Sequence, residues 1–166
     1  MTNETVQVAI IMGSDSDLPV VEASFSILDD FGVKYTKNVM SAHRTPHDVM
    51  ELIKNSEENG CKVFIAAAGM AAHLAGAVAA HSTKPVIGIP IESGGMGGID
   101  SLLSTAMMPP GVPVATVAVG KSGAKNSAIL AVQILATSNE DLAQKLVEYK
   151  QNMRSEVLDK DKKLNS

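Results

Sequence analysis

The sequence alternates five times between a short run typical of a β-strand and a longer stretch typical of a helix. The first run, Val6 to Met12, is nearly continuous in apolar residues, as expected of a parallel strand that is covered on both faces. A crossover between parallel strands needs a connection about as long as a helix, and each gap between these runs is long enough. The expected strands are residues 6–12, 33–40, 63–68, 86–91 and 114–119.

Helix signals fill the gaps between the strand-like runs. The stretch from Asp17 to Gly32 has a helix start, an apolar stripe and a glycine at its end, and Pro46 to Asn59 is followed by Gly60. Residues 71–80 and 99–108 are also expected to be helical. We therefore expect an α/β fold, a flavodoxin-like three-layer sandwich whose five-stranded parallel sheet has the order 2-1-3-4-5. That order places the loops after strands two, one and three side by side.

The chain is expected to form one domain with extended C-terminal helices. Its 166 residues are enough for one hydrophobic core and too few for two. A polar cap beginning at Ser138 starts a charged final helix, and the last residues are polar. The predicted layout is a single domain over residues 1–166, with a core at 6–137, a C-terminal helix at 139–158 and a frayed tail at 159–166.

The segment just before the final helix is apolar nearly all round. It runs from Ala128 to Ala136. A helix that is apolar on every side is buried on every side, and a core of this size covers only part of it. We therefore expect a subunit interface here, with Ala128, Ala131 and Ala136 permitting close helix contact.

Composition excludes several classes of protein. Charged residues make up 19% and hydrophobic residues 45%, which argues against a disordered chain. The formal net charge of -4 argues against electrostatic binding of nucleic acid. No apolar run approaches the ~20 residues that cross a bilayer, so we expect a cytoplasmic protein without a membrane segment. The single cysteine, Cys61, excludes an internal disulfide and a multi-cysteine metal cluster, and is expected to be a buried thiol.

The loop after the second expected strand contains the residues most suggestive of chemistry. Its sequence, Ser41 to Pro46, places the imidazole of His43 beside the guanidinium of Arg44. A neutral imidazole can accept a proton at physiological pH. A guanidinium can donate two parallel hydrogen bonds to a phosphate. Thr45 and Asp48 have the spacing of a capping pair for the next helix. A lone loop histidine is more often a surface residue, so this loop alone leaves both interpretations open.

The loops after the first, third and fourth strands are also unusual. Residues 13–17 are small, hydroxyl and acidic residues that precede a helix. Such a loop can bind a phosphate, and Asp17 can bind a ribose diol. The same residue types also form turns and helix caps, so both interpretations stay open. Residues 66–74 hold no polar side chain before His73, which suits either a flat ligand against the backbone or tight strand–helix packing. The glycine-rich residues 93–98 are interpreted as a mobile lid or a subunit contact.

Three motifs taken together resemble a known family. They are Gly13-Ser14-Asp15-Ser16-Asp17, Ser41-Ala42-His43-Arg44-Thr45-Pro46 and Ala68-Gly69-Met70-Ala71-Ala72-His73-Leu74. In this order, at the ends of three successive strands, they resemble the N5-carboxyaminoimidazole ribonucleotide mutases of purine biosynthesis, and the resemblance spans Val6 to about Leu158. Residues 100–104, 113–116 and 133–135 also resemble the bacterial mutase branch rather than the branch that carboxylates aminoimidazole ribonucleotide with free CO2.

The resemblance implies an isomerase that converts N5-carboxyaminoimidazole ribonucleotide to 4-carboxy-5-aminoimidazole ribonucleotide in IMP biosynthesis. It implies a homo-octamer with sites between subunits. It also implies a functional link between this protein and a separate ATP-dependent carboxyaminoimidazole ribonucleotide synthetase. Neither a cofactor nor a metal ion is expected. His43 would be the general acid/base. The substrate-binding residues would be Ser14, Asp17, Ser41, Ala42, Arg44, Gly69, His73 and Leu74.

Two positions depart from the family pattern. Met70 stands where the family mostly has a small residue and is expected to narrow the pocket, and Ala75 takes a position often held by proline and is expected to loosen the start of its helix. Two alternative functions stay open. One is direct CO2-dependent carboxylation of aminoimidazole ribonucleotide, and the other is non-catalytic nucleotide binding on the same fold.

Overall fold

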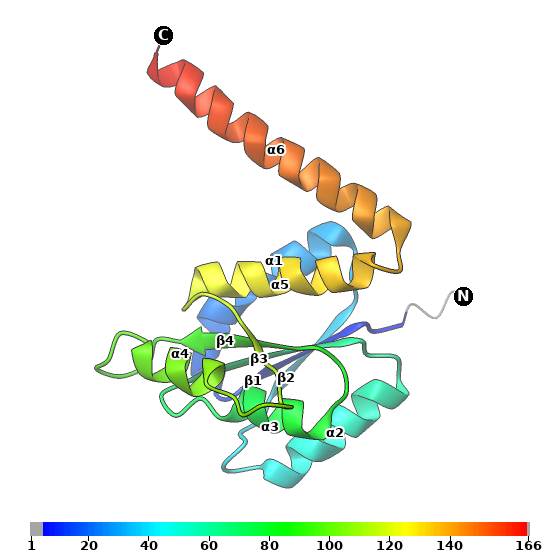
Figure 1. Ribbon diagram of the computed structural model, residues 1–166, viewed down its shortest axis with the longest axis vertical. Coiled ribbons are helices and arrows are strands. Elements are labelled where there is room, and N and C mark those ends of the chain that lie inside the picture. Colours follow the sequence, from blue (N-terminus) through cyan, green and yellow to red (C-terminus); the bar gives the residue numbers. More distant parts are fainter. Residues whose placement is uncertain (1–4, 166) are drawn as a thin grey trace.

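A parallel sheet positions every other part of the molecule. The computed structural model describes residues 5–165. All five strands run parallel in the order β2-β1-β3-β4-β5, which confirms the predicted order, and helices cover both faces of the sheet (Figure 1). The strands are β1 Val8–Met12, β2 Tyr35–Val39, β3 Val63–Gly69, β4 Val86–Ile91 and β5 Ala115–Thr116.

The helices follow the strands in the expected alternation. A short 3-10 turn, Asp15–Asp17, leads into the first of them. Gly32 ends that helix in the left-handed conformation at φ 72°, as its place in the sequence predicted. The helices are α1 Leu18–Phe31, α2 Pro46–Glu58, α3 Leu74–His81, α4 Ile99–Ala106, α5 Lys121–Ala136 and α6 Glu140–Leu164.

The two faces of the sheet carry separate hydrophobic cores. In β1, Val8 and Ile10 pack with α1 and α5, whereas Ala9 and Ile11 pack with α2 and α3. Successive side chains of a strand point to opposite faces, so an uninterrupted apolar strand supplies both cores. With both faces covered, the carboxyl ends of the strands are held at one edge of a rigid layer.

The fifth strand is much shorter than predicted. Only Ala115–Thr116 pairs with β4, whereas the sequence predicted a strand over residues 114–119. Pro90 of β4 presents its carbonyl to this edge, where the carbonyl accepts the N–H of Gly120 at 3.0 Å. Proline has no N–H to donate in return, so the ladder is incomplete at this point.

Helix α3 begins later than predicted, at Leu74 rather than at residue 71. Met70 has a left-handed φ of 54°, and two tight turns follow it. The N–H of Ala72 donates to the Met70 carbonyl at 2.9 Å, and the N–H of His73 donates to the Ala71 carbonyl at 2.8 Å. These turns are incompatible with helical backbone, which therefore starts only after them.

Helix α5 is covered mainly by its own chain. Ala128 and Ala131 are fully buried in the core that α5 forms with α1 and the sheet. The expectation that these two small residues meet another subunit is wrong, because the close packing they permit is with the α1 side of their own chain. Ala136 is only partly buried.

Helix α6 does not end at Leu158 as predicted. It continues to Leu164, so most of the expected frayed tail over residues 159–166 is helical. Residues of good helix propensity continue through this stretch, and Lys162 lies in the last turn, where a cation interacts favourably with the helix dipole. Lys162 Nζ also lies 3.9 Å from an oxygen of Asp159. Ser166 is outside the described residues.

Only the first half of α6 is attached to the body of the protein. Lys145 donates from Nζ to the Phe31 carbonyl at 3.0 Å, and the ring of Tyr149 lies 5.7 Å from that of Phe31. Beyond Tyr149 the side chains are exposed, and Figure 1 shows the helix projecting away from the sheet. Across residues 5–165, no helix has the length and apolar character that crossing a membrane would require.

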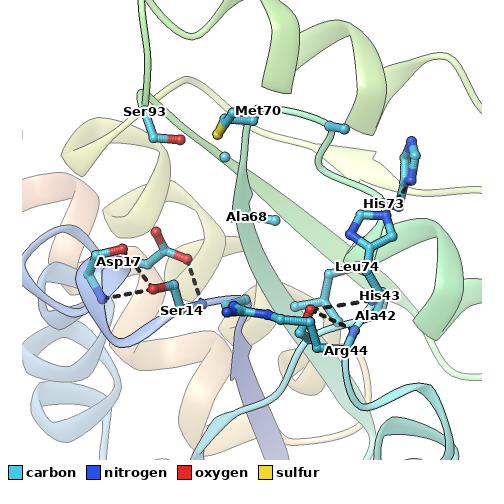
Figure 2. Close-up of a pocket in the computed structure, with 15 residues that line it drawn as sticks. Ser14, Asp17, Ala42, His43, Arg44, Ala68, Met70, His73, Leu74 and Ser93 are labelled. Carbon is cyan, nitrogen blue, oxygen red and sulfur yellow. Dashed lines mark hydrogen bonds between the residues drawn. The ribbon is translucent and has the colours of Figure 1, made fainter.

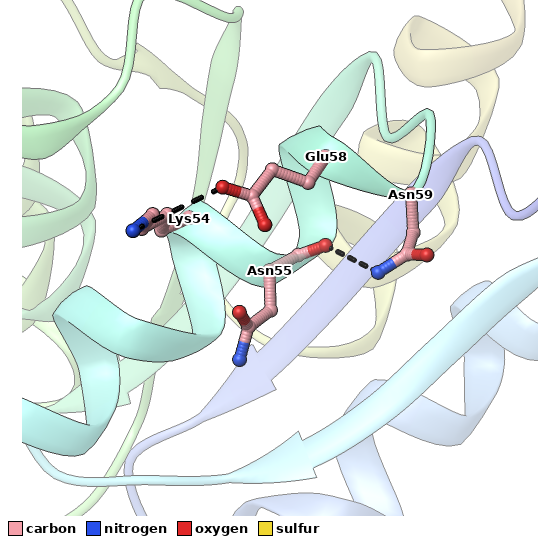
Figure 3. A network of polar contacts seen from close by, with 4 residues as sticks. All are labelled: Lys54, Asn55, Glu58 and Asn59. Atoms are coloured by element: carbon pink, nitrogen blue, oxygen red, sulfur yellow. Dashed lines mark hydrogen bonds and ion pairs between the residues drawn. The ribbon is translucent and has the colours of Figure 1, made fainter.

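The C-terminal end of α2 is held by local polar contacts. Lys54 Nζ lies 3.9 Å from Glu58, and the Asn59 side chain donates to the Asn55 carbonyl at 2.7 Å (Figure 3). Exposed pairs with this spacing contribute only ~0.3–0.5 kcal/mol, so they shape the helix end more than they stabilise the fold. Cys61, which follows this turn, is buried as predicted, and burial raises the pKa of its thiol.

Candidate active site

A cavity of about 500 Å³ opens at the carboxyl edge of the sheet, where the loops after β1, β2 and β3 meet. The strand order causes this convergence, because β1 lies between β2 and β3. All nine residues that the sequence singled out line the cavity. They are Ser14, Asp17, Ser41, Ala42, His43, Arg44, Gly69, His73 and Leu74. The roles assigned to them stay a prediction.

The cavity has two walls of different chemistry (Figure 2). The loops after β1 and β2 form what we call the polar wall, which consists of Ser14, Ser16, Asp17, Ser41 and Arg44. The end of β3 forms the apolar wall, which consists of Ala68, Gly69, Met70 and Ala71. His43 comes from the loop after β2 and His73 from the loop after β3, so the two imidazoles connect the loops that build the two walls.

The loop after β1 is shaped by its own hydrogen bonds. The Ser14 hydroxyl accepts the N–H of Ser16 at 3.3 Å, and the Asp17 carboxylate accepts the N–H of Ser14 at 3.2 Å. This reciprocal pair is a capping box for the 3-10 turn at Asp15–Asp17. The sequence left turn formation and ligand binding open for this loop, and turn formation is confirmed.

Asp17 is a buried carboxylate in the polar wall. Only 4% of its surface is exposed. Burial raises the pKa of Asp17 above its ordinary value; the Ser14 N–H opposes this shift, and the charge of Asp15 adds a smaller increase. A carboxylate repels a phosphate but accepts hydrogen bonds from hydroxyl groups. The position therefore suits the ribose hydroxyls of a nucleotide better than its phosphate.

The loop after β2 is closed by contacts between Thr45 and Ser41. Thr45 Oγ1 accepts the Ser41 N–H at 2.9 Å and donates to the Ser41 carbonyl at 3.1 Å. Thr45 is the N-cap residue of α2, but the predicted side-chain cap is wrong, because the hydroxyl bonds backwards to Ser41 instead. The Ser41 hydroxyl in turn accepts the N–H groups of His43 at 3.3 Å and Arg44 at 3.2 Å. These bonds hold both residues at the cavity.

Arg44 links the loops after β1 and β2. One guanidinium N–H donates to the carbonyl of Gly13 at 3.4 Å. Figure 2 shows the side chain extending towards Ser14. A guanidinium has five N–H donors, so one bond to a carbonyl leaves most of its capacity for an anion beside Ser14.

His43 and His73 face each other across 30 residues of sequence. Nε2 of His43 lies 2.8 Å from Nδ1 of His73, and the ring centroids are 4.9 Å apart at an interplanar angle of 71°. At that distance one ring nitrogen donates a proton to the other. The pair can therefore share a proton inside the cavity, which suits acid/base catalysis.

The apolar wall depends on a very close approach at the end of β3. A Cβ on Gly69 would lie 1.8 Å from Ser93 Oγ and 3.2 Å from the Ile91 carbonyl oxygen, so a larger residue there would force Ser93 to move. A Cβ on Gly13, which also lines the cavity, would meet nothing nearer than 3.6 Å. Tight packing is therefore a firm requirement at Gly69 and not at Gly13.

Sequence reasoning missed Ser93 as a cavity residue. The glycine-rich sequence around Ser93 suggests a lid or a subunit contact, yet Ser93 lines the cavity directly. The signal was available, because Ser93 follows β4 and the predicted order places β4 beside β3. Met70 also lines the cavity, while Ala75 is only 3% exposed and packs in the core on the α2 and α3 side.

The cavity combines anion donors, a carboxylate, two hydrogen-bonded imidazoles and an apolar wall. Such a set suits a phosphorylated sugar bearing a flat heterocycle, with proton transfer at the heterocycle. Within the described part of the chain, no group of three or more His, Cys, Asp or Glu side chains is arranged to hold a metal ion.

Comparisons with known proteins point to one family. A family model described as AIR carboxylase matches residues 7–156. The N5-carboxyaminoimidazole ribonucleotide mutase of Thermotoga maritima is 51% identical over 158 residues, which are 95% of this chain and 91% of that protein. The enzyme of the same name from Bacillus subtilis is 51% identical over 152 residues, 92% of this chain and 94% of that protein. The crystal structure of Treponema denticola PurE matches with a TM-score of 0.88 at 30% identity, covering 96% of this chain and 99% of that one.

Proposed function

This chain belongs to the AIR carboxylase family, and we infer from that premise that it is an isomerase of purine biosynthesis. It converts N5-carboxyaminoimidazole ribonucleotide to 4-carboxy-5-aminoimidazole ribonucleotide. Relatives that are 45–51% identical carry the mutase name. The observation that best supports the chemistry is the 2.8 Å contact between His43 and His73 at a cavity with one polar and one apolar wall.

The first step of the proposed mechanism releases CO2. Protonated His43 gives its proton to the exocyclic nitrogen of the carbamate, the bond between that nitrogen and the carboxyl carbon breaks, and the electron pair stays on nitrogen. The products are CO2 and aminoimidazole ribonucleotide, both still in the cavity. His73, hydrogen-bonded to His43, keeps the reacting imidazole oriented during this transfer.

The second step forms the new carbon–carbon bond. The aminoimidazole is enamine-like, so ring carbon four attacks the retained CO2 and becomes tetrahedral. The proton on that carbon then passes to His43, which restores both the aromatic ring and the protonated imidazole. No atom or electron is gained or lost overall, as an isomerisation requires.

The two walls have separate tasks in this proposal. In the polar wall, Arg44 and Ser14 bind the phosphate and Asp17 binds the ribose hydroxyls. The residues that line the base are Ser41, Ala42, Gly69 and Leu74. The apolar wall surrounds CO2, which carries no charge and gains nothing from polar neighbours. Catalysis then comes mainly from positioning and from keeping water and CO2 apart.

We also propose that the chain works as a cytoplasmic homo-octamer supplied by a separate carboxyaminoimidazole ribonucleotide synthetase. The number eight follows from the resemblance of the three motifs. A contact surface is supported by exposed apolar side chains on α4 and at its C-cap, where Ile99, Leu103 and Met107 are 57%, 54% and 77% exposed. Light scattering during size-exclusion chromatography measures the assembly directly.

Initial rates with two substrates test the proposed reaction. The purified protein is given the carbamate nucleotide alone, and separately aminoimidazole ribonucleotide with bicarbonate. We expect fast formation of the carboxylated nucleotide from the first and only slow formation from the second. Faster turnover of the second would support the direct carboxylase instead, and tight binding of both nucleotides without turnover would support a non-catalytic binding domain.

A further inference from the structure

One cavity residue has a backbone conformation that its side chain does not favour. Met70 has φ 54°, and among residues 5–165 it is the sole residue other than glycine with a positive φ. The left-handed region is unfavourable for any residue with a Cβ, so a structure keeps such a residue only where its surroundings enforce it. Backbone strain of this kind concentrates at functional sites.

The surroundings of Met70 enforce the conformation. The Met70 carbonyl accepts the N–H of Ala72 at 2.9 Å and the hydroxyl of Ser104 from α4 at 3.5 Å. On the preceding side, Gly69 is packed so closely against Ser93 that a Cβ there would displace the Ser93 side chain. The chain is therefore tightly packed at Gly69 and places a long side chain immediately after it.

The Met70 side chain lies at the cavity without being buried. It lines the cavity, yet 61% of its surface is exposed. Figure 2 shows it beside Ser93, on the opposite side of the cavity from Ser14 and Arg44. Methionine is unbranched, flexible and apolar, so its thioether can change rotamer and cover a ligand that enters. An exposed apolar side chain at the mouth of a cavity is well placed to become a cover.

We propose that Met70 is a positioning residue that closes the apolar wall over the CO2 released in the proposed reaction. This inference rests on the proposed function, because the CO2 to be covered is released in the cavity only in that reaction. The other members of the apolar wall, Ala68, Gly69 and Ala71, are too small to reach across the mouth. Met70 is the member with enough length, and it adds no polar group that would bring water to CO2.

Retention of CO2 is measured by isotope exchange. The product nucleotide is supplied with a 13C carboxylate in unlabelled bicarbonate buffer, and the label lost per turnover is followed by mass spectrometry as the enzyme interconverts the two nucleotides. Met70→Ala and Met70→Gly both remove the side chain, and Met70→Leu keeps an apolar side chain of similar size. Met96→Ala is the control, because Met96 is 62% exposed in the neighbouring glycine-rich loop and is not among the cavity residues.

We expect at least a doubling of label loss per turnover in Met70→Ala and Met70→Gly, and wild-type loss in Met70→Leu and Met96→Ala. Met70→Gly should also melt roughly 2–4 °C above Met70→Ala, because glycine relieves the left-handed strain. Equal leakage in these two variants despite that difference would assign the effect to the side chain rather than to the backbone.

Two outcomes would count against different conclusions. If the wild-type protein interconverts the nucleotides and Met70→Ala and Met70→Gly lose label no faster than wild type, Met70 does not retain CO2 and this inference is wrong. Leakage in Met70→Gly alone would also overturn it, since loop flexibility would then be the cause. If the wild-type protein does not interconvert the nucleotides at all, the proposed function has failed.

Discussion

The polar wall and the apolar wall of the cavity are built by different means. The polar wall is held by hydrogen bonds within its own loops, such as the capping box of Ser14 and Asp17 and the contacts of Thr45 with Ser41. The apolar wall is held by steric fit, with Gly69 pressed against Ser93 and with Met70 in a left-handed conformation. Hydrogen bonds leave donors and acceptors near a ligand, whereas steric fit requires no polar side chain in Ala68, Gly69, Met70 or Ala71.

This difference separates binding from chemistry in the proposed function. Changes in the polar wall should weaken nucleotide binding, while changes at the imidazole pair should affect turnover and changes in the apolar wall should affect packing and CO2 retention. The expected sizes differ enough to test the separation, beginning with the imidazole.

Replacing the proposed acid/base, His43, should have the largest effect. His43→Asn keeps a polar side chain near His73 but cannot carry a proton between nitrogen and carbon, so we expect turnover to fall by roughly 10²–10⁴-fold. Binding of a phosphorylated nucleotide, measured by calorimetry, should stay close to wild type. His47→Asn is the matched control, because His47 is exposed on α2 and is not among the cavity residues. Turnover at the wild-type rate by His43→Asn would contradict the acid/base role proposed for His43.

Removing the guanidinium should act on binding. Arg44→Leu removes the cationic donors beside Ser14, and a hydrogen bond to a charged group contributes about 1.5–3 kcal/mol. We therefore expect KM and the nucleotide Kd to rise by roughly 10–100-fold with a much smaller change in kcat. Arg154→Leu, on the exposed part of α6, is the control. A fall in kcat with unchanged Kd would place Arg44 in the chemistry instead.

Adding one carbon to the apolar wall should destabilise the fold. Gly69→Ala would place a Cβ 1.8 Å from Ser93 Oγ and 2.9 Å from Ser93 Cβ, and we expect a loss of about 1–3 kcal/mol in the free energy of unfolding measured in urea. Gly13→Ala, where the nearest atom would be 3.6 Å away, should lose much less.

A double variant tests the cause of that loss. Combining Gly69→Ala with Ser93→Gly removes both clashing side-chain atoms and leaves only the Ile91 carbonyl at 3.2 Å, so stability should return in part. Equal stability of the variants at positions 69 and 13 would contradict the steric account of the apolar wall.

The smallest expected effect concerns the pH dependence of stability at Asp17. Its pKa is raised in the folded protein, mainly by burial, so the folded state holds the proton more tightly than the unfolded chain. The stability that this provides is fully present below the ordinary value of 3.8 and is lost as pH rises through the raised folded value. The asparagine side chain of Asp17→Asn cannot ionise. The melting temperature of this variant should therefore rise relative to that of wild type as pH rises through that window. A difference that is constant with pH would argue against the raised pKa.

Much of the fold was predictable because its signals are local. The apolar run of β1, the left-handed Gly32 and the proline at the start of α2 each act within a few residues. Errors arose where a residue of another strand, or a competing contact within one loop, decided the outcome. The fifth strand is short because Pro90, in another strand, lacks an N–H, and the Thr45 hydroxyl bonds to Ser41 rather than capping α2.

For the site, the sequence predicts which loops meet but not the atomic contacts between them. A parallel sheet in the order 2-1-3-4-5 brings the carboxyl ends of β1, β2 and β3 together whatever the side chains are. The same reasoning applied to β4 would have added Ser93. Sequence reasoning could not show that Gly69 packs tightly against Ser93 or that the backbone of Met70 is left-handed, because both depend on atomic contacts between segments.

The sequence by itself determined the alternation of strands and helices and the motifs at the strand ends, because apolar periodicity, glycine stops and helix caps are properties of neighbouring residues. Only the tertiary structure decided that two imidazoles 30 residues apart share a 2.8 Å contact. Such distances follow from how the β2 and β3 loops are held across the sheet edge, and sequence spacing carries no record of that geometry.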